Sequence, residues 1–185
     1  VGIAEEHAVA FASGIAKAGG KPVFATHSSF IQRTFDQLSQ DLCINNNPAT
    51  IIVCTASVFG MNDVTHLGIY DIPLISNIPN MVYLAPTSKE EYFAMLDWSI
   101  EQSDHPVAVR MPCNGVISSG EKVDSDYSDL NKYKITQNGS RVAVIALGDF
   151  WQLGENTVKY ISENSGIKPT LINPRYITGI DEEML

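Results

Sequence analysis

The sequence predicts an α/β protein: a parallel sheet with helices on both of its faces, followed by part of a second α/β domain. Short apolar runs rich in β-branched residues alternate along the chain with longer segments of helical periodicity. A polar segment rich in Ser, Asp, Asn and Lys then separates the first four apolar runs from two more. We therefore expect a first domain over residues 1–115, a linker over 116–140 and a partial second domain over 141–185.

The individual elements follow from the hydrophobic pattern in chain order. Apolar residues at helical spacing predict helices, and short apolar runs bounded by Gly, Pro or Asn predict strands. In the first domain these segments are helix 6–18, strand 23–25, helix 29–44, strand 50–54, strand 81–84, helix 88–100 and strand 107–111. A loop over residues 55–70 follows the second strand.

Two of these helices begin at a capping-box pattern, in which a Ser and a Glu or Gln three residues later satisfy backbone N–H groups. The pairs are Ser29 with Gln32 and Ser88 with Glu91. After Ser29, apolar residues recur on one helix face: Ile31, Phe35, Leu38 and Leu42. We expect this face to pack against the sheet.

The strand at residues 50–54 is almost entirely apolar, which is typical of a parallel strand buried on both faces. The second domain is expected to contain strand 141–147, helix 150–165 and strand 170–173. Two strands and one helix cannot close a sheet core by themselves, so we expect these residues to be the first part of a larger domain.

Composition excludes several classes of partner. Twelve Lys and Arg against 21 Asp and Glu give a formal net charge of −9, without a basic patch, so we expect no nucleic-acid or anionic-membrane partner. No apolar run reaches the roughly 18 residues that a membrane helix needs. The cysteines, Cys43, Cys54 and Cys113, are odd in number and widely spaced. This pattern is typical of reduced thiols and predicts a cytoplasmic protein.

Common nucleotide and hydrolase motifs are missing from the sequence. No G-x-G-x-x-G follows a strand, and neither a P-loop nor a G-x-S-x-G elbow is present. Cysteines and histidines are scattered without metal-ligand spacing, so we expect no metal site within this chain.

Several blocks of sequence, taken together and in order, resemble the pyrimidine-binding domain of transketolase-like thiamine diphosphate enzymes. Within that family they are most similar to the 1-deoxy-D-xylulose-5-phosphate synthases. The blocks are Val1-Gly2-Ile3-Ala4-Glu5-Glu6-His7-Ala8-Val9, Ser28-Ser29-Phe30-Ile31-Gln32-Arg33-Thr34-Phe35-Asp36-Gln37, Thr65-His66-Leu67-Gly68, Ile78-Pro79-Asn80-Met81, Pro86-Thr87-Ser88 and Ala108-Val109-Arg110-Met111-Pro112.

The resemblance implies thiamine diphosphate as cofactor, with Mg²⁺ held by a diphosphate-binding domain or subunit outside these residues, and a homodimer. It implies a transferase that joins decarboxylated pyruvate to glyceraldehyde 3-phosphate. One alternative is a transketolase-like subunit that moves a two-carbon ketol unit between sugar phosphates. Another is a non-catalytic subunit that lends a pyrimidine-binding face. We expect the isolated chain to be inactive.

Glu5 is the central residue of the resemblance. A glutamate at this position hydrogen-bonds the pyrimidine ring nitrogen and favours the imino tautomer, which requires a sheltered carboxyl that can share a proton. Considered alone, Glu5 and Glu6 are also favourable acids for the first turn of a helix. We assign the catalytic and cofactor-binding role to Glu5 and the helix-end role to Glu6.

Phe30 and Arg33 lie on the next resembling block. By resemblance Phe30 stacks on the aminopyrimidine, and it sits off the apolar line of the helix that it begins. Arg33, three residues on, either faces the cofactor or pairs on the surface with Asp36 or Gln37.

Two histidines are assigned to the substrates. His66 lies in a loop after a buried strand, where catalytic residues of parallel sheets gather, and the resemblance implies proton transfer to substrate oxygens. His27 stands where many synthases of this type have a tyrosine, and it keeps the capacity to hydrogen-bond substrate.

The resemblance assigns Arg110 to the acceptor phosphate, for which a guanidinium is well shaped. The chain departs from the family around this residue. Thr55 and Cys113 stand where the synthases carry arginines, and Asn62-Asp63 replaces the usual Asp-Gly. These changes affect the acceptor and spare the cofactor, so we expect either weak binding of a phosphorylated acceptor or a preference for another aldehyde acceptor.

Overall fold

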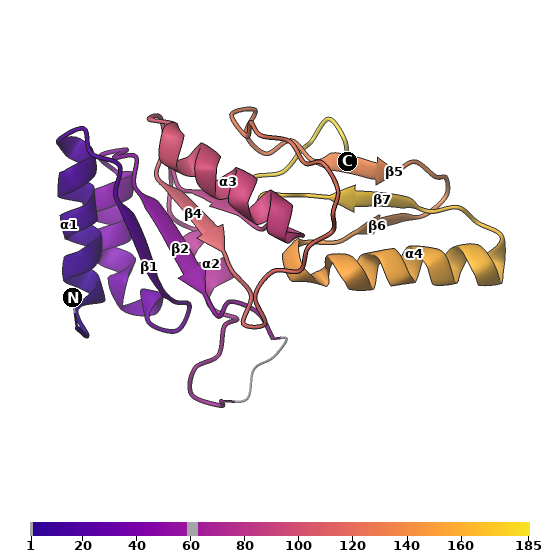
Figure 1. Ribbon diagram of the computed structural model, residues 1–185, viewed down its shortest axis with the longest axis horizontal. Helices are drawn as coiled ribbons and strands as arrows, with labels where there is room; N and C mark the ends of the chain where they lie inside the picture. Colours follow the sequence, from indigo (N-terminus) through magenta and orange to yellow (C-terminus); the bar gives the residue numbers. More distant parts are fainter. Residues whose placement is uncertain (1, 59–62) are drawn as a thin grey trace.

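The computed structural model describes residues 2–58 and 63–185 (Figure 1). Its first sheet has four parallel strands in the order β1-β2-β4-β3. The strands are β1 (Val23–His27), β2 (Thr50–Cys54), β3 (Val82–Leu84) and β4 (Val107–Arg110). The carboxyl ends of β1, β2 and β4 lie side by side, since His27 is in register with Cys54 and Val53 with Arg110.

Helices cover both faces of this sheet, as the sequence predicts. One face packs against α1 (Glu5–Lys17), η1 (Ile31–Thr34), η2 (Gln37–Cys43) and α2 (Asp71–Ile75), and the other against α3 (Lys89–Glu101). Alternate residues of a strand point to opposite faces. Accordingly Ala108 lies in the first of these two cores, and its neighbours Val107 and Val109 lie in the second.

The segment after β1 differs from the single α-helix expected over 29–44. It is a 3₁₀ turn (η1) followed by a π-helical turn (η2), and Ser29 caps neither. In a 3₁₀ turn with three residues per turn, a residue four positions on is rotated by about 120°. Phe35 is therefore turned away from Ile31 and is 47% exposed, although the sequence pattern predicts it in the core.

Only one of the two hydrogen bonds of the capping box expected at Ser88 is formed. Ser88 Oγ accepts the Glu91 N–H at 3.2 Å and caps α3. The Glu91 carboxylate does not reach back to Ser88; it accepts from the backbone and hydroxyl of Thr87, both at 2.8 Å. The reason is tertiary, because Asn173 of β7 also donates to this buried carboxylate at 3.0 Å.

The second unit has three strands, one more than the sequence predicts. Strands β6 (Ala143–Ile145) and β7 (Thr170–Asn173) are parallel, and β5 (Lys134–Gln137) pairs with β7 antiparallel. β5 lies inside the range 116–140 that was predicted as a linker. Its residues are mostly polar and partly exposed, so the segment resembles a loop in composition. η3 (Gly148–Phe150) and α4 (Trp151–Ser165) follow β6.

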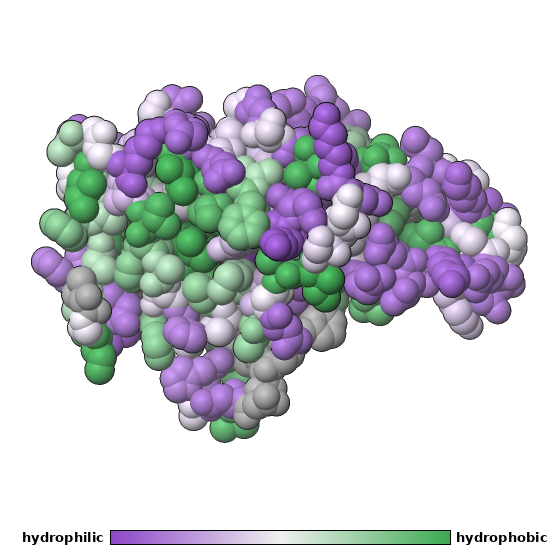
Figure 2. Space-filling view, in the orientation of Figure 1, coloured by the Kyte–Doolittle hydropathy of each residue, from purple (hydrophilic) through white to green (hydrophobic). Residues whose placement is uncertain are grey.

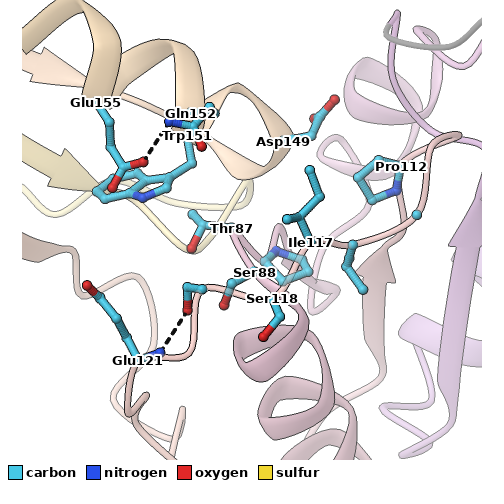
Figure 3. A pocket seen from close by; sticks show the side chains of 14 residues that line it. Thr87, Ser88, Pro112, Ile117, Ser118, Glu121, Asp149, Trp151, Gln152 and Glu155 are labelled. Carbon is cyan, nitrogen blue, oxygen red and sulfur yellow. Dashed lines mark hydrogen bonds between the residues drawn. The ribbon is translucent and has the colours of Figure 1, made fainter.

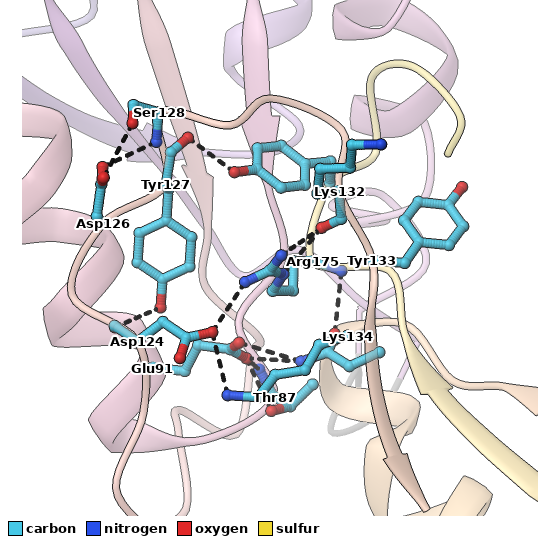
Figure 4. Close-up of polar contacts among 12 residues, drawn as sticks. Thr87, Glu91, Asp124, Asp126, Tyr127, Ser128, Lys132, Tyr133, Lys134 and Arg175 are labelled. Carbon is cyan, nitrogen blue, oxygen red and sulfur yellow. Dashed lines mark hydrogen bonds and ion pairs between the residues drawn. The ribbon is translucent and has the colours of Figure 1, made fainter. Parts of the chain in front are cut away.

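The two units are joined along a polar seam (Figure 4). Arg175, just after β7, donates to the Lys132 carbonyl at 3.0 Å and to Asp124 at 3.0 Å. Its own carbonyl accepts the Ala85 N–H at 2.8 Å. These contacts hold the second unit against the end of β3, and they place η3 at the carboxyl end of β4.

Exposed apolar side chains occur on both units. On the face shown in Figure 2, hydrophobic residues gather over the first sheet, and hydrophilic residues cover most of α4. Exposed apolar side chains include Ile3, Phe11 and Val23. No helix among the described residues is long and apolar enough to cross a membrane.

Candidate active site

Glu5 begins α1, and its side chain is only 14% exposed. Its Oε2 atom is buried and accepts no hydrogen bond from any described residue. The Arg33 Nη1 atom lies 3.7 Å away, which is close enough for an ion pair and beyond hydrogen-bond range. A buried acceptor without a donor is costly, so Glu5 presents an unfilled position for a hydrogen-bond donor.

Arg33 lies over the start of α1. Its Nε donates to Glu6 Oε1 at 3.2 Å, and its Nη1 approaches Glu5. The surface alternative, pairing with Asp36 or Gln37, is not found among the described residues. Arg33 is thus placed beside the central glutamate, and Glu6 combines its helix-end position with an ion pair to Arg33.

Phe30 lies between two histidines that come from different elements. Its ring centroid is 5.3 Å from that of His27, at the end of β1, and 5.3 Å from that of His66, in the loop after β2. Both contacts are edge-to-face, the geometry that aromatic rings favour. Phe30 remains 36% exposed. Phe30, His27 and His66 therefore form one cluster, and all three are among the residues that the sequence analysis assigned to the cofactor or the substrates.

His66 is held by its own loop. Its Nδ1 atom lies 3.0 Å from Asp63 Oδ2 and 2.8 Å from Thr65 Oγ1. Hydrogen bonds from the Thr65 hydroxyl and backbone, with a smaller contribution from His66, lower the pKa of Asp63 below its ordinary value. An ionised Asp63 favours the proton on Nδ1 and leaves Nε2 as an acceptor. Asp63 belongs to the pair Asn62-Asp63, which the sequence analysis predicts to be a departure from the family pattern, and Asn62 lies outside the described residues.

His27 is oriented by Thr55. The His27 Nδ1 atom lies 2.7 Å from Thr55 Oγ1, across the adjacent ends of β1 and β2. Thr55 has a positive φ of 53°, which turns the chain at the end of β2. Thr55 therefore supports a histidine of the cluster.

Arg110 is buried, and each of its nitrogens has a partner. Nε donates to Asp71 at 2.8 Å, Nη1 to Asp149 at 3.4 Å and Nη2 to the Gly68 carbonyl at 3.2 Å. Burial alone would lower the pKa of Arg110, but the hydrogen bond to Asp71 and that residue's charge raise it overall. Arg110 is therefore a charged, internally paired group.

Tyr83 completes this buried network. Its hydroxyl donates to Asp71 at 2.5 Å, and burial, with the charge of Asp71, raises the Tyr83 pKa well above its ordinary value. Sequence reasoning missed Tyr83, Asp71 and Asp149. The signal for Asp71 was an acid in an apolar helical segment, whereas nothing local marks Asp149 as a partner of Arg110.

Asp149 lines one cavity, and its hydrogen-bond partners Arg110 and Ser57 line another. One, of about 340 Å³, lies between the start of α3, residues 112–121 and the start of α4 (Figure 3). It is lined by Glu121, Asp149 and Glu155, beside Trp151, and by none of the six site residues predicted from sequence. The other, of about 400 Å³, is lined by Arg110, Ser57 and mainly apolar side chains.

This fold and this cluster at the carboxyl edge of a parallel sheet define a cofactor-binding α/β domain of the transketolase class. The chain belongs to the family described as "Transketolase, pyrimidine binding domain", whose model matches residues 1–116. This match confirms the resemblance on which the site residues were chosen.

Curated relatives extend the similarity over the whole chain. It is 37% identical to 1-deoxy-D-xylulose-5-phosphate synthase of Brevibacillus brevis and 39% identical to that of a Clostridium botulinum strain. Both matches cover 100% of this chain and 29% of the relative. The chain thus spans under a third of the length of these relatives.

Solved structures share the fold at lower identity. A split-gene transketolase, described as an inactive β4 tetramer, superimposes with a TM-score of 0.77 at 22% identity, covering 95% of this chain and 56% of that one. A Pichia stipitis transketolase superimposes with a TM-score of 0.81 at 19% identity, covering 93% of this chain and 26% of that one. These two likenesses define the fold alone.

The family implies thiamine diphosphate, and Glu5 fits that group. A protonated ring nitrogen would supply the donor that the buried Oε2 atom lacks. The exposed part of the Phe30 ring offers an aromatic surface a few residues from Arg33. Among the described residues, no group of three or more acids, histidines or cysteines is placed to hold a metal ion.

Proposed function

We propose that this chain supplies the pyrimidine-binding half of a thiamine diphosphate site that joins decarboxylated pyruvate to an aldehyde acceptor. The observation that carries the proposal is the buried Oε2 atom of Glu5, which has no hydrogen-bond donor among the described residues and lies 3.7 Å from Arg33. The identity of 37–39% with the synthases favours this reaction over ketol transfer between sugar phosphates.

The site has two regions. The cofactor side comprises Glu5, Arg33 and Phe30, and the acceptor side comprises Asp71, Arg110 and Asp149. His27 and His66 lie against Phe30 and serve the substrates in the proposal.

The bound cofactor supplies a nucleophilic carbon that adds to carbonyl groups. Glu5 holds a proton shared with the pyrimidine ring nitrogen, and Arg33 keeps the carboxylate oriented from 3.7 Å. Phe30 packs against the ring. His66 gives or takes a proton at a substrate oxygen through Nε2, while Asp63 holds Nδ1; such groups contribute typically 10²–10⁴-fold to the rate. His27 donates or accepts one further hydrogen bond.

The rest of the site belongs, in this proposal, to another domain or subunit. It binds the diphosphate and Mg²⁺, and the complete enzyme is a homodimer. The 29% coverage of the relatives supports this division of labour.

The test uses the complete enzyme, with the diphosphate-binding part present. Pyruvate-dependent CO₂ release is measured with and without thiamine diphosphate, and products formed with aldehydes are analysed by mass spectrometry. The proposal predicts cofactor-dependent CO₂ release and a ligated ketose. Transfer from a ketose phosphate without CO₂ release would instead support the transketolase alternative, and binding of cofactor without either reaction would support a non-catalytic subunit.

A further inference from the structure

The loop that carries His66 is mostly exposed. Between residues 63 and 70, Gly68 alone is buried. The His66 side chain is 48% exposed, and its hydrogen bonds with Asp63 and Thr65 lie within the same loop. Such bonds orient the imidazole relative to the loop, but they do not hold the loop against the rest of the protein. The position of His66 therefore depends in part on what holds Gly68, two residues further on.

Gly68 packs closely against the end of β2. It forms an isolated antiparallel bridge with Ser57. A Cβ atom at position 68 would lie 2.1 Å from the Thr55 carbonyl oxygen and 2.8 Å from the Ser57 nitrogen. Both of these are backbone atoms, which cannot rotate away as a flexible side chain can. This close approach of two backbone segments requires glycine at position 68.

Arg110 connects Gly68 to the sheet. Its Nη2 atom donates to the Gly68 carbonyl at 3.2 Å, and its Nε atom donates to Asp71 at 2.8 Å. Asp71 is the first residue of α2, three residues after Gly68. One planar guanidinium therefore contacts both ends of the turn between the His66 loop and α2. Arg110 itself ends β4, in register with Val53 of β2.

The guanidinium is held in place by buried partners. Tyr83 of β3 donates its hydroxyl to Asp71 at 2.5 Å, on the same carboxylate oxygen that accepts from Arg110. The side chains of Asp71 and Arg110 are 0% and 9% exposed, and Tyr83 is fully buried. Hydrogen bonds are electrostatically stronger in such surroundings than in water. Buried side chains from β3, α2 and β4 thus fix the group that holds Gly68.

We propose that Arg110 is a positioning residue for His66. By holding the Gly68 carbonyl, it keeps the loop where the imidazole lies edge-on to Phe30, with the two ring centroids 5.3 Å apart. The inference rests on the proposed function, which assigns proton transfer at substrate oxygens to His66. It is separate from the phosphate-binding role that the family resemblance implies, because positioning acts through Gly68 and needs no contact with substrate.

The first experiment is a double-mutant cycle on the complete enzyme, with pyruvate as donor and D-glyceraldehyde 3-phosphate as acceptor. Arg110→Lys keeps the positive charge, but an ammonium group lacks the planar fork that reaches both Asp71 and Gly68. We expect kcat to fall by about ten- to a hundredfold, since a small misplacement of a catalytic group has effects of this size. In a His66→Ala background, the same substitution should change kcat by less than about twofold.

Gly68→Ala displaces the loop without altering Arg110. The added methyl group meets the Thr55 carbonyl, so the backbone has to shift. We expect a similar fall in kcat that is again lost in the His66→Ala background. Gly14→Ala is the matched control, because position 14 is exposed and a Cβ atom there would have no neighbour within 4 Å. Its kcat should stay within about twofold of that of the unsubstituted enzyme.

Hydrogen exchange measured by mass spectrometry gives a second readout that needs no turnover. Peptides within residues 63–70 should exchange faster in Arg110→Lys and in Gly68→Ala than in the unsubstituted enzyme. The same peptides should be unchanged in Gly14→Ala. A general loss of folding would instead raise exchange throughout the chain, so the local effect separates positioning of the loop from overall stability.

Two results would overturn the inference. One is a loss of kcat in Arg110→Lys that is equally large in the His66→Ala background, because Arg110 would then act independently of His66. The other is unchanged exchange over residues 63–70 in both Arg110→Lys and Gly68→Ala. The proposed function fails by a separate observation, the absence of thiamine-dependent CO₂ release from pyruvate. In that event the exchange measurement still decides whether Arg110 holds the loop.

Discussion

The Glu5 carboxylate of the cofactor side and the Arg110 guanidinium of the acceptor side differ in how completely they are paired. On the cofactor side, Glu5 Oε2 is buried without a donor among the described residues, and Phe30 is 36% exposed. On the acceptor side, each nitrogen of Arg110 already donates within the protein. An unpaired buried acceptor is stabilised by a ligand that brings a donor, whereas a paired cation gains little from another anion. Whether a polar side chain is available to a ligand depends on whether its atoms are already hydrogen-bonded within the protein, and residue type alone does not show this.

Glu5→Gln is the sharpest test of the cofactor side. Glutamine keeps the size of the side chain but cannot share a proton with a ring nitrogen, so we expect kcat of the complete enzyme to fall by about 10²–10⁴-fold. CO₂ release from pyruvate is the measurement. Glu6→Gln, one residue along the same helix turn, should keep most of the activity. Near-normal turnover in Glu5→Gln would remove this residue from the mechanism.

Arg110→Met tests whether the acceptor side is an internal structural unit. The substitution leaves the buried Asp71 carboxylate without its cation, which typically costs about 3–5 kcal/mol of stability. Denaturant unfolding measures this loss. Lys132→Met is the control, because its ion pairs with Asp181 and Glu183 are partly exposed, and water screens such pairs so that they contribute little to stability. Equal, small losses in both variants would mean that Arg110 is not a structural anchor.

Phe30→Ala should lower cofactor affinity more than stability, whereas Arg110→Met should mainly lower stability. Lost burial and stacking should weaken cofactor affinity by about 1–3 kcal/mol, while a side chain this exposed contributes little to folding. Calorimetric titration of thiamine diphosphate and a melting curve provide the two measurements. Phe35→Ala, also largely exposed, should leave cofactor affinity unchanged. A lower melting temperature with unaltered affinity would place Phe30 in the core instead.

Asp63→Asn should have the smallest effect, because it acts through the orientation of His66. We expect acceptor turnover to fall by up to about tenfold. The pKa of Asp63 lies below its ordinary value, mainly because of the hydrogen bonds from Thr65, so its ionised form persists wherever an ordinary aspartate is ionised and is lost only as the pH falls through the lowered pKa. The pH–rate profile between 5 and 8 should therefore lack an inflection from Asp63. An inflection that disappears in Asp63→Asn would contradict this assignment.

Much of the fold could be predicted from local patterns. The four strands of the first sheet and the cap at Ser88 were predicted close to where they occur, because buried parallel strands are continuous apolar runs. The segment after β1 and strand β5 were not. A change of helical pitch at Phe35 leaves no local signal, and a half-exposed strand such as β5 resembles a loop in composition.

The sequence by itself determined the fold class and the family, and it led to the prediction of the cofactor-side residues, because motifs and hydrophobic periodicity are local properties of the chain. Only the tertiary structure decided the pairing of those residues. Whether Arg110 is available to an anion depends on Asp71, 39 residues before it, and on Asp149, 39 residues after it in a different unit. Electrostatic energy depends on distance in space and on burial, and neither quantity is encoded in the spacing of residues along the chain.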